Sequence, residues 1–207
     1  MKISAQQITG IRNDRVLFEN LSFNCNQGNI VHIRGKNGAG KTTLMRMLCA
    51  LARPQAGTIR WNDIDIHENR AEYCQEFTYV GHDNGIKGDL TVAENIRFDR
   101  AIRTNSSKVS VSDIMQLLGI ERYADVPCRY LSAGQKRLAA LSRIVSSDAQ
   151  LWFLDEPFTA LDETSQNTVV RLLAAHQKNG GACIVTSHQS VQWNDAKVDE
   201  LNLGDMN

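Results

Sequence analysis

One eight-residue segment, Gly-Lys-Asn-Gly-Ala-Gly-Lys-Thr at positions 35–42, limits what this chain can fold into. It fits the pattern G-x-x-x-x-G-K-[ST], and it lies between a short apolar run and a stretch with apolar residues at helical spacing. Glycines let backbone N–H groups turn inward around phosphate oxygens, and the start of the following helix adds a partial positive charge. The segment therefore predicts a strand, a phosphate-binding loop and a helix, in that order.

Within the loop, individual side chains have expected tasks. Lys41 should reach the β- and γ-phosphates of ATP, Thr42 should bind Mg²⁺, and Thr43 should hydrogen-bond the α-phosphate. ATP and Mg²⁺ are therefore the expected cofactors. The residues expected to contact the nucleotide are Gly35, Asn37, Gly38, Gly40, Lys41, Thr42 and Thr43.

Two adjacent carboxylates follow an apolar run at 151–154. Such a run predicts a strand that is covered on both faces, and a carboxylate at its carboxyl end can lie beside the phosphate loop. Asp155 is expected to hold the hydration shell of Mg²⁺, and Glu156 to orient or deprotonate an attacking water. A solvated turn is the alternative, which the four preceding apolar residues disfavour.

A second short motif, Leu-Ser-Ala-Gly-Gln at 131–135, begins a predicted helix. Ser132 and Gln135 have the spacing of a capping box, so one interpretation is simply a well-capped helix. A helix start with a free serine and a glycine, Gly134, is also a suitable clamp for a phosphate. We predict that it clamps the γ-phosphate bound to a second copy, because we expect it in a different lobe from the chain's own phosphate loop.

Composition narrows the class of protein. The chain has 207 residues, 42% of them hydrophobic, which is enough for one well-buried core or one core with a small lobe. Lys plus Arg and Asp plus Glu each total 23, so no nucleic-acid partner is expected. No stretch approaches the roughly 20 apolar residues of a membrane span. The five cysteines form no CxxC pair, which favours reduced thiols packed as small hydrophobes over a metal or redox role.

Strand and helix patterns alternate along the chain and predict an α/β fold with a parallel sheet. The expected strands are at 30–33, 77–80, 151–154 and 182–186, with a hairpin at 58–66 and a helix at 162–180. Leu44, Leu48 and Leu51 predict the helix after the phosphate loop. Residues 83–147 are mainly helical, with a polar interruption at 104–108, and are expected to form a separate lobe.

Together these motifs resemble the ATP-binding cassette (ABC) family over nearly the whole chain. The resemblance implies a P-loop NTPase fold with a RecA-like core, an N-terminal antiparallel β subdomain and an inserted helical subdomain. We expect a single domain, with the core and β subdomain at 1–82 and 148–207 and the helical subdomain at 83–147. The resemblance also implies ATP hydrolysis between two copies, with Lys41, Glu156 and His188 as catalytic residues.

Three positions depart from the usual pattern of that family. His82 stands where glutamine is usual, and its imidazole can still bond a metal-bound water, so it is a candidate metal-site residue that would make the coupling pH-sensitive. Arg12 stands where many cassettes stack an aromatic ring on adenine. Its guanidinium plane could stack instead, and a solvated arginine is the open alternative. Ala133 replaces a glycine and is small enough to leave the clamp working.

Within the family, the chain is similar to the ATP-binding subunits of the bacterial cytochrome c maturation system. The similarity is carried by the segments 81–82, 85–87, 90–91, 131–137 and 152–158. It implies an ATPase bound peripherally to integral membrane subunits at the cytoplasmic face of the bacterial inner membrane. There, hydrolysis would drive release of a haem-loaded chaperone or haem export. No residue stands out as a haem ligand, so no direct haem ligation is expected.

Alternatives to that function stay open. The chain could serve a transporter for another small substrate, since nothing in its composition identifies one. It could instead be a soluble ATP switch in translation or DNA repair, although no second cassette, coiled coil or zinc module is evident. An inactive binding module is disfavoured by intact Lys41, Asp155, Glu156 and His188.

Overall fold

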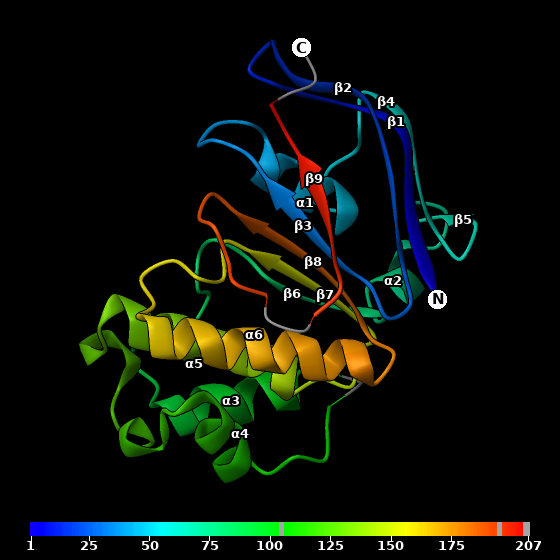
Figure 1. Cartoon of the computed structure of the whole chain (residues 1–207). Helices are drawn as coiled ribbons and strands as arrows, with labels where there is room; N and C mark the ends of the chain where they lie inside the picture. The colour runs from blue at the N-terminus through cyan, green and yellow to red at the C-terminus, as the bar shows by residue number, and fades with distance from the viewer. Residues whose placement is uncertain (104–105, 194–195, 205–207) are drawn as a thin grey trace.

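The computed structural model describes residues 1–103, 106–193 and 196–204. Its chain builds a parallel sheet and an antiparallel sheet, with one helix between them and a group of helices on the far side of the parallel sheet (Figure 1). The predicted fold class, an α/β cassette with an antiparallel β subdomain and an inserted helical segment, is confirmed.

The parallel sheet has five strands in the order β6-β7-β8-β3-β9. They are β6 (Phe77–Val80), β7 (Leu151–Asp155), β8 (Ala182–Ser187), β3 (Ile30–Arg34) and β9 (Val198–Asn202). All residues of β7 are buried, and its side chains alternate between two hydrophobic clusters. Trp152 and Leu154 belong to one cluster, Leu151 and Phe153 to the other. The prediction of a strand covered on both faces is therefore confirmed for β7.

The antiparallel sheet is formed by strands from the N-terminal part of the chain, in the order β2-β1-β4-β5. Its strands are β1 (Lys2–Arg12), β2 (Arg15–Asn26), β4 (Ala56–Trp61) and β5 (Ile64–Asp65). Asn62 and Asp63, which connect β4 to β5, have φ of 49° and 68°. Two left-handed residues in a two-residue connection are typical of a tight hairpin turn, which confirms the hairpin predicted here.

Helices cover both faces of the parallel sheet. The helix α1 (Lys41–Leu48) packs between the two sheets, and α2 (Arg70–Tyr73) lies near β5 (Figure 1). The opposite face carries α3 (Val92–Ala101), α4 (Val111–Leu118), α5 (Ala133–Val145) and α6 (Glu163–Lys178), with the short turns η1 (Glu121–Tyr123) and η2 (Cys128–Tyr130). The segment from α3 to α5 is the inserted one, between β6 and β7. Its boundaries at 83 and 147 stay a prediction.

Some local expectations were wrong or incomplete. Leu51 does not belong to the helix after the phosphate loop, since α1 ends at Leu48 and Ala50 has φ 53°, which stops the helix. The strand β9 and the helix α2 were not predicted. Of the expected polar interruption at 104–108, positions 104 and 105 lie outside the described residues. The thiols of Cys25, Cys49, Cys128 and Cys183 are buried, and that of Cys74 is exposed.

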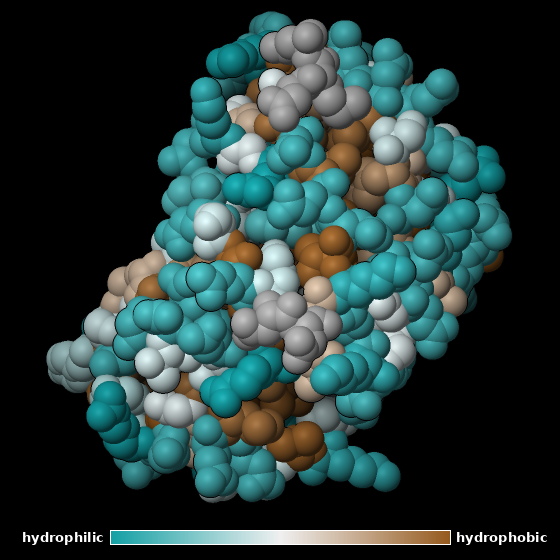
Figure 2. Space-filling view, viewed as in Figure 1, coloured by the Kyte–Doolittle hydropathy of each residue, from teal (hydrophilic) through white to brown (hydrophobic). Residues whose placement is uncertain are grey.

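The face of the molecule in Figure 2 is mainly polar. On the face in Figure 2 hydrophilic residues predominate, and hydrophobic residues appear in small groups between them. Within the described part of the chain, no helix has the length and apolar character that a membrane crossing requires.

Candidate nucleotide site

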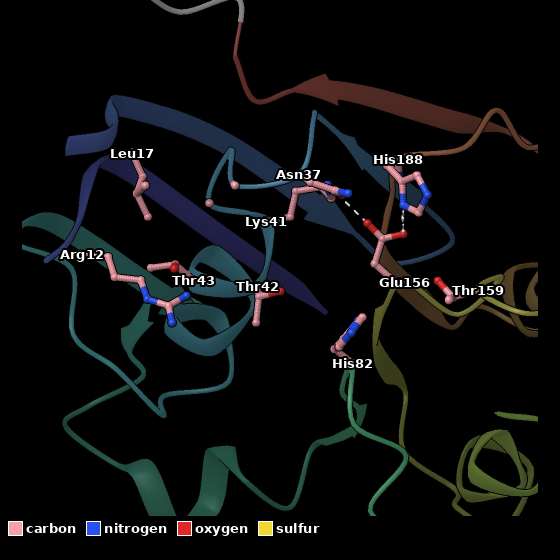
Figure 3. Close-up of a pocket in the computed structure, with 12 residues that line it drawn as sticks. Arg12, Leu17, Asn37, Lys41, Thr42, Thr43, His82, Glu156, Thr159 and His188 are labelled. Carbon is pink, nitrogen blue, oxygen red and sulfur yellow. Dashed lines mark hydrogen bonds and ion pairs between the residues drawn. The ribbon is translucent and has the colours of Figure 1, made fainter. Parts of the chain in front are cut away.

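A cavity of about 310 Å³ opens beside the phosphate loop, at the carboxyl edge of the parallel sheet. Figure 3 shows side chains from the antiparallel sheet, from the phosphate loop, from α1 and from the loops after β6, β7 and β8 converging on it. The cavity is lined by Arg12, Leu17, Asn37, Gly38, Gly40, Lys41, Thr42, Thr43, His82, Glu156, Thr159 and His188. Most of the residues predicted for the nucleotide site are therefore brought together in one cavity.

The glycines of the phosphate loop have conformations that other residues adopt rarely. Gly38 has φ +85° and Gly40, which directly precedes α1, has φ +98°. A Cβ on Gly40 would lie 3.0 Å from the Cβ of Leu17. Gly35 is the exception among the predicted contact residues, because it does not line this cavity and packs against the carbonyl oxygen of Leu203.

Lys41 is held inside the loop and is only 6% exposed. Its Nζ donates to the carbonyl oxygens of Gly35 and Lys36 at 2.6 and 3.2 Å. The same Nζ forms an ion pair with Oε1 of Glu156 at 3.2 Å. The ammonium group therefore reaches across from the phosphate loop to the carboxylate that follows β7 (Figure 3).

Glu156 lies between a cation and an imidazole. Its second oxygen, Oε2, is 2.9 Å from Nδ1 of His188 and accepts a longer bond from the backbone N–H of the same residue, at 3.3 Å. Glu156 is 8% exposed. A carboxylate placed at the wall of a polar cavity, next to a lysine and a histidine, has the geometry to orient a water for attack on a phosphate.

Asp155 is fully buried, and only one of its two carboxylate oxygens accepts a hydrogen bond from a described residue. Oδ1 accepts from Thr186 Oγ1 at 2.6 Å, whereas Oδ2 has no hydrogen-bond partner among the described residues. An unpartnered buried carboxylate oxygen is costly unless a cation or a water binds it. With the hydroxyl of Thr42 at the cavity wall, the residues present fit the oxygen donors that Mg²⁺ prefers.

Two predicted residues lie at opposite ends of the cavity. Figure 3 shows Arg12 near Leu17, Thr42 and Thr43, and His82 below Glu156. Both Arg12 and His82 are exposed. Stacking of Arg12 on adenine and a role for His82 at the metal stay predictions.

The motif at 131–135 lies away from this cavity, since none of its residues lines it. Ser132 and Gln135 form the predicted capping box, with bonds of 2.8 and 3.2 Å, and Ser132 is exposed. A Cβ on Gly134 would lie 2.5 Å from the carbonyl oxygen of Ala160, so α5 begins directly against the segment after β7. The clamp role of Ser132, Gly134 and Gln135 toward a second copy stays a prediction.

Sequence reasoning missed several residues at the site. Leu17 and Thr159 line the cavity, while Arg137 and Thr186 bond the backbone beside the carboxylates. Thr186 lies near the end of a predicted strand, and Arg137 follows another basic residue in a predicted helix, so no local pattern marks either for a role at the site. Only the tertiary packing brings them to the site.

Comparison with known proteins supports a family assignment. The family model described as "ABC transporter" matches residues 18–159. The "Cytochrome c biogenesis ATP-binding export protein CcmA" of Vibrio parahaemolyticus is 39% identical over 98% of this chain and 100% of its own length. Among solved structures, a putative ABC transporter ATP-binding protein from Pyrococcus furiosus superimposes with a TM-score of 0.82 at 22% identity, covering 100% of this chain and 99% of its own. A dimeric ATP-binding cassette bound to ADP and Pi gives a TM-score of 0.78 at 19% identity, covering 90% and 88%.

Proposed function

This chain belongs to the ABC transporter family, and we propose that it is the ATP-hydrolysing subunit of a membrane complex. The observation that carries the proposal is the position of Glu156 between Lys41 of the phosphate loop and His188, in a single cavity. This arrangement supplies a phosphate cradle, a cation and a base within one site.

In the proposed reaction, ATP enters with its phosphates in the loop, and Lys41 turns from Glu156 to the β- and γ-phosphates. The freed carboxylate of Glu156 then orients a water in line with the γ-phosphate and accepts a proton as the water oxygen bonds to phosphorus. The bond between the γ-phosphorus and the bridging oxygen breaks, and ADP and phosphate leave. His188 holds the second carboxylate oxygen and lies at the wall where the γ-phosphate would be.

Thr42 and Asp155 are the residues that would hold Mg²⁺, with His82 near its water shell. Bound there, the metal would neutralise charge on the phosphates. The support for this assignment is the free buried oxygen of Asp155 and the position of Thr42 at the cavity wall.

We further propose that the site is completed by a second copy. The start of α5 presents an exposed serine at the N-terminal end of a helix, yet it does not line the chain's own cavity. A helix start of this kind binds anions, and the similar cassette bound to ADP and Pi is dimeric. Ser132, Gly134 and Gln135 of one copy would then contact the γ-phosphate held by the other.

The pathway is proposed from the relatives. Proteins that cover this chain over nearly its full length are named as cytochrome c biogenesis ATP-binding export proteins. We infer that this chain works in cytochrome c biogenesis, bound to integral membrane subunits at the cytoplasmic face of the bacterial inner membrane. There, hydrolysis would drive the release of a haem-loaded chaperone or the export of haem.

The ATPase assignment is tested with Glu156→Gln. The amide keeps the size of the side chain but cannot accept the proton, so steady-state turnover should fall by about 100-fold or more while ATP binding is retained. Closed dimers should accumulate with ATP, as measured by light scattering after size exclusion. Hydrolysis at the wild-type rate would remove Glu156 from the proposed role. As a second variant, Ser132→Arg should block turnover by obstructing the partner's phosphate.

The pathway is tested by purifying the tagged protein from detergent-solubilised native membranes. Partners are identified by mass spectrometry and haem by its absorbance. Membrane subunits that co-purify with a haem-handling protein would support the cytochrome c assignment. A different permease without haem would keep the ATPase and replace the pathway, and the absence of any membrane partner would favour a soluble ATP switch.

A further inference from the structure

The peptide group that joins Asp155 to Glu156 is hydrogen-bonded at both ends. Its carbonyl oxygen accepts from Nη2 of Arg137 at 2.6 Å. Its N–H donates to the carbonyl oxygen and to Oγ1 of Thr186, at 3.2 and 3.0 Å. The plane of this peptide is therefore fixed by residues that lie 18 and 30 positions away along the chain.

The plane matters because Glu156 has a left-handed backbone, with φ +54°. A residue with a Cβ is strained there by about 1–2 kcal/mol, and such a conformation persists only where its surroundings hold it. The turn to positive φ directs the carboxylate toward Lys41 and His188, which it contacts at 3.2 and 2.9 Å. A change in the peptide plane would move the carboxylate away from both.

Arg137 is an unusual residue for this task, because it is a buried cation whose hydrogen bonds go only to neutral acceptors. It is 3% exposed, and among the described residues no carboxylate lies within ion-pair distance of it. Its guanidinium donates to the carbonyl oxygens of Asp155 and Gly81, the latter at 2.7 Å, and to Oδ1 of Asn84 at 3.2 Å. Burial lowers the pKa of Arg137 to about 10, so the group stays charged at neutral pH.

Stability alone gives a poor account of such a group. Burial lowers the pKa of Arg137 even though the charges of Asp155 and Glu156 act to raise it, so these carboxylates offset the desolvation cost only in part. The hydrogen bonds of the guanidinium indicate a more specific task. Nη2 donates to the peptide before Glu156, whereas Nη1 donates to Gly81 and Asn84 in the loop that contains His82. The two loops that approach the cavity from β6 and β7 are thereby joined through one side chain of α5.

We propose that Arg137 is a positioning residue for the base of the hydrolytic reaction: it fixes the Asp155–Glu156 peptide so that Glu156 faces the γ-phosphate. It also ties the placement of Glu156 to the loop at 81–84. This inference rests on the proposed ATPase function. Arg137 does not line the cavity, and it acts through Glu156.

The test is a double-mutant cycle on the full-length chain, with single-turnover ATP hydrolysis and ATP binding measured separately. Arg137→Gln should slow the hydrolytic step by about 100-fold, the loss expected for a reacting group displaced by about 1 Å. The dissociation constant for ATP should stay within about twofold, because the phosphate loop is untouched. In the Glu156→Gln background, Arg137→Gln should have almost no further effect, since the base that it positions is already gone.

Arg143→Gln is the matched control. Arg143 lies on the same helix and donates to the carbonyl oxygen of Gly85 at 2.5 Å, so it also contacts the loop after β6. It has no bond to Asp155 or Glu156, and its removal should leave the hydrolytic step within about threefold of wild type. Arg137→Lys keeps the charge, so its single-turnover rate of hydrolysis should lie between those of Arg137→Gln and wild type. It serves as the second variant if Arg137→Gln does not fold.

The possible failures can be told apart. Equal losses in the wild-type and Glu156→Gln backgrounds, from Arg137→Gln or from Arg137→Lys where Arg137→Gln does not fold, would overturn the positioning role. A wild-type single-turnover rate in a folded Arg137→Gln variant would overturn it as well. If the wild-type chain binds no ATP and hydrolyses none, alone or with its membrane partners, the proposed function itself fails, whatever Arg137 does.

Discussion

At the scale of single residues, the left-handed backbone of Glu156 predicts that glycine is more stabilising than alanine at this position, the reverse of their order in a helix. Glu156→Gly and Glu156→Ala both remove the carboxylate, so they differ only in the Cβ at φ +54°. We expect the glycine variant to be more stable than the alanine variant by about 1 kcal/mol. Chemical denaturation of both variants measures the difference. Ala175→Gly, at an exposed site of α6, is the control and should lose about 1 kcal/mol.

An alanine variant that is as stable as the glycine variant, or more so, would show that the Glu156 backbone relaxes once its carboxylate is removed. The strain would then belong to the contacts with Lys41 and His188. Glu156 also shows which property of a site residue the sequence predicts: its chemistry is predicted, and its backbone conformation is not. A carboxylate after an apolar strand is visible in the chain, but its left-handed turn is not, since only glycine and asparagine signal one reliably.

At the scale of elements, the start of α5 depends on one glycine and not on its neighbour. Ala133 is exposed, whereas a Cβ on Gly134 would lie 2.5 Å from the backbone oxygen of Ala160. Gly134→Ala should therefore push α5 away from the segment after β7 and cost about 1–3 kcal/mol, with loss of turnover. Ala133→Gly should cost less than about 1 kcal/mol and keep turnover. Thermal unfolding and ATPase assays on the two variants test the difference, and equal effects would contradict it.

Elements were predictable from sequence in proportion to their burial. The strands β7 and β8 were found because apolar residues run unbroken through 151–154 and 182–185, and α6 because Asp162 caps it. The edge strand β9 was missed since its burial pattern is mixed and three of its five residues are exposed. The helix α2 has only four residues, too few to show a helical period.

The site was predictable where residues carry a recognisable chemistry close together in sequence, as in the phosphate loop and Asp155–Glu156. It was not predictable where a contact depends on the fold. Arg137 reaches Gly81 across 56 positions, and Thr186 reaches Asp155 across 31. Such contacts are created by the packing of α5 against β6 and by the pairing of β8 with β7, and no local pattern marks them.

At the scale of the whole molecule, a buried histidine predicts loss of stability in acid. His32 in β3 is 1% exposed and packs edge-on against Trp193 at 5.2 Å. Burial lowers the pKa of His32 from 6.5 to about 4, so between these values the unfolded chain binds the proton that the folded chain excludes. The contribution of neutral His32 to the free energy of unfolding is complete above about pH 6.5. It is lost as pH falls toward 4, by up to about 1.4 kcal/mol per pH unit.

His32→Phe removes the titrating group and keeps an aromatic ring beside Trp193. The slope of unfolding free energy against pH, measured by denaturation between pH 6.5 and 4.5, should be shallower in this variant than in wild type. Some slope should remain, because burial also lowers the pKa of His176 to about 4. Parallel curves for wild type and His32→Phe would mean that His32 is accessible to protons in the folded state.

The separation of the motif at 131–135 from its own cavity has a genetic consequence. If each reaction centre combines Glu156 of one copy with Ser132 of the other, defects at the two positions should complement when they are carried by different chains. A mixed pair then has one centre with both lesions and one with neither. Cells that express the two defective alleles together would recover function that neither allele provides alone, while a single allele with both lesions would rescue nothing.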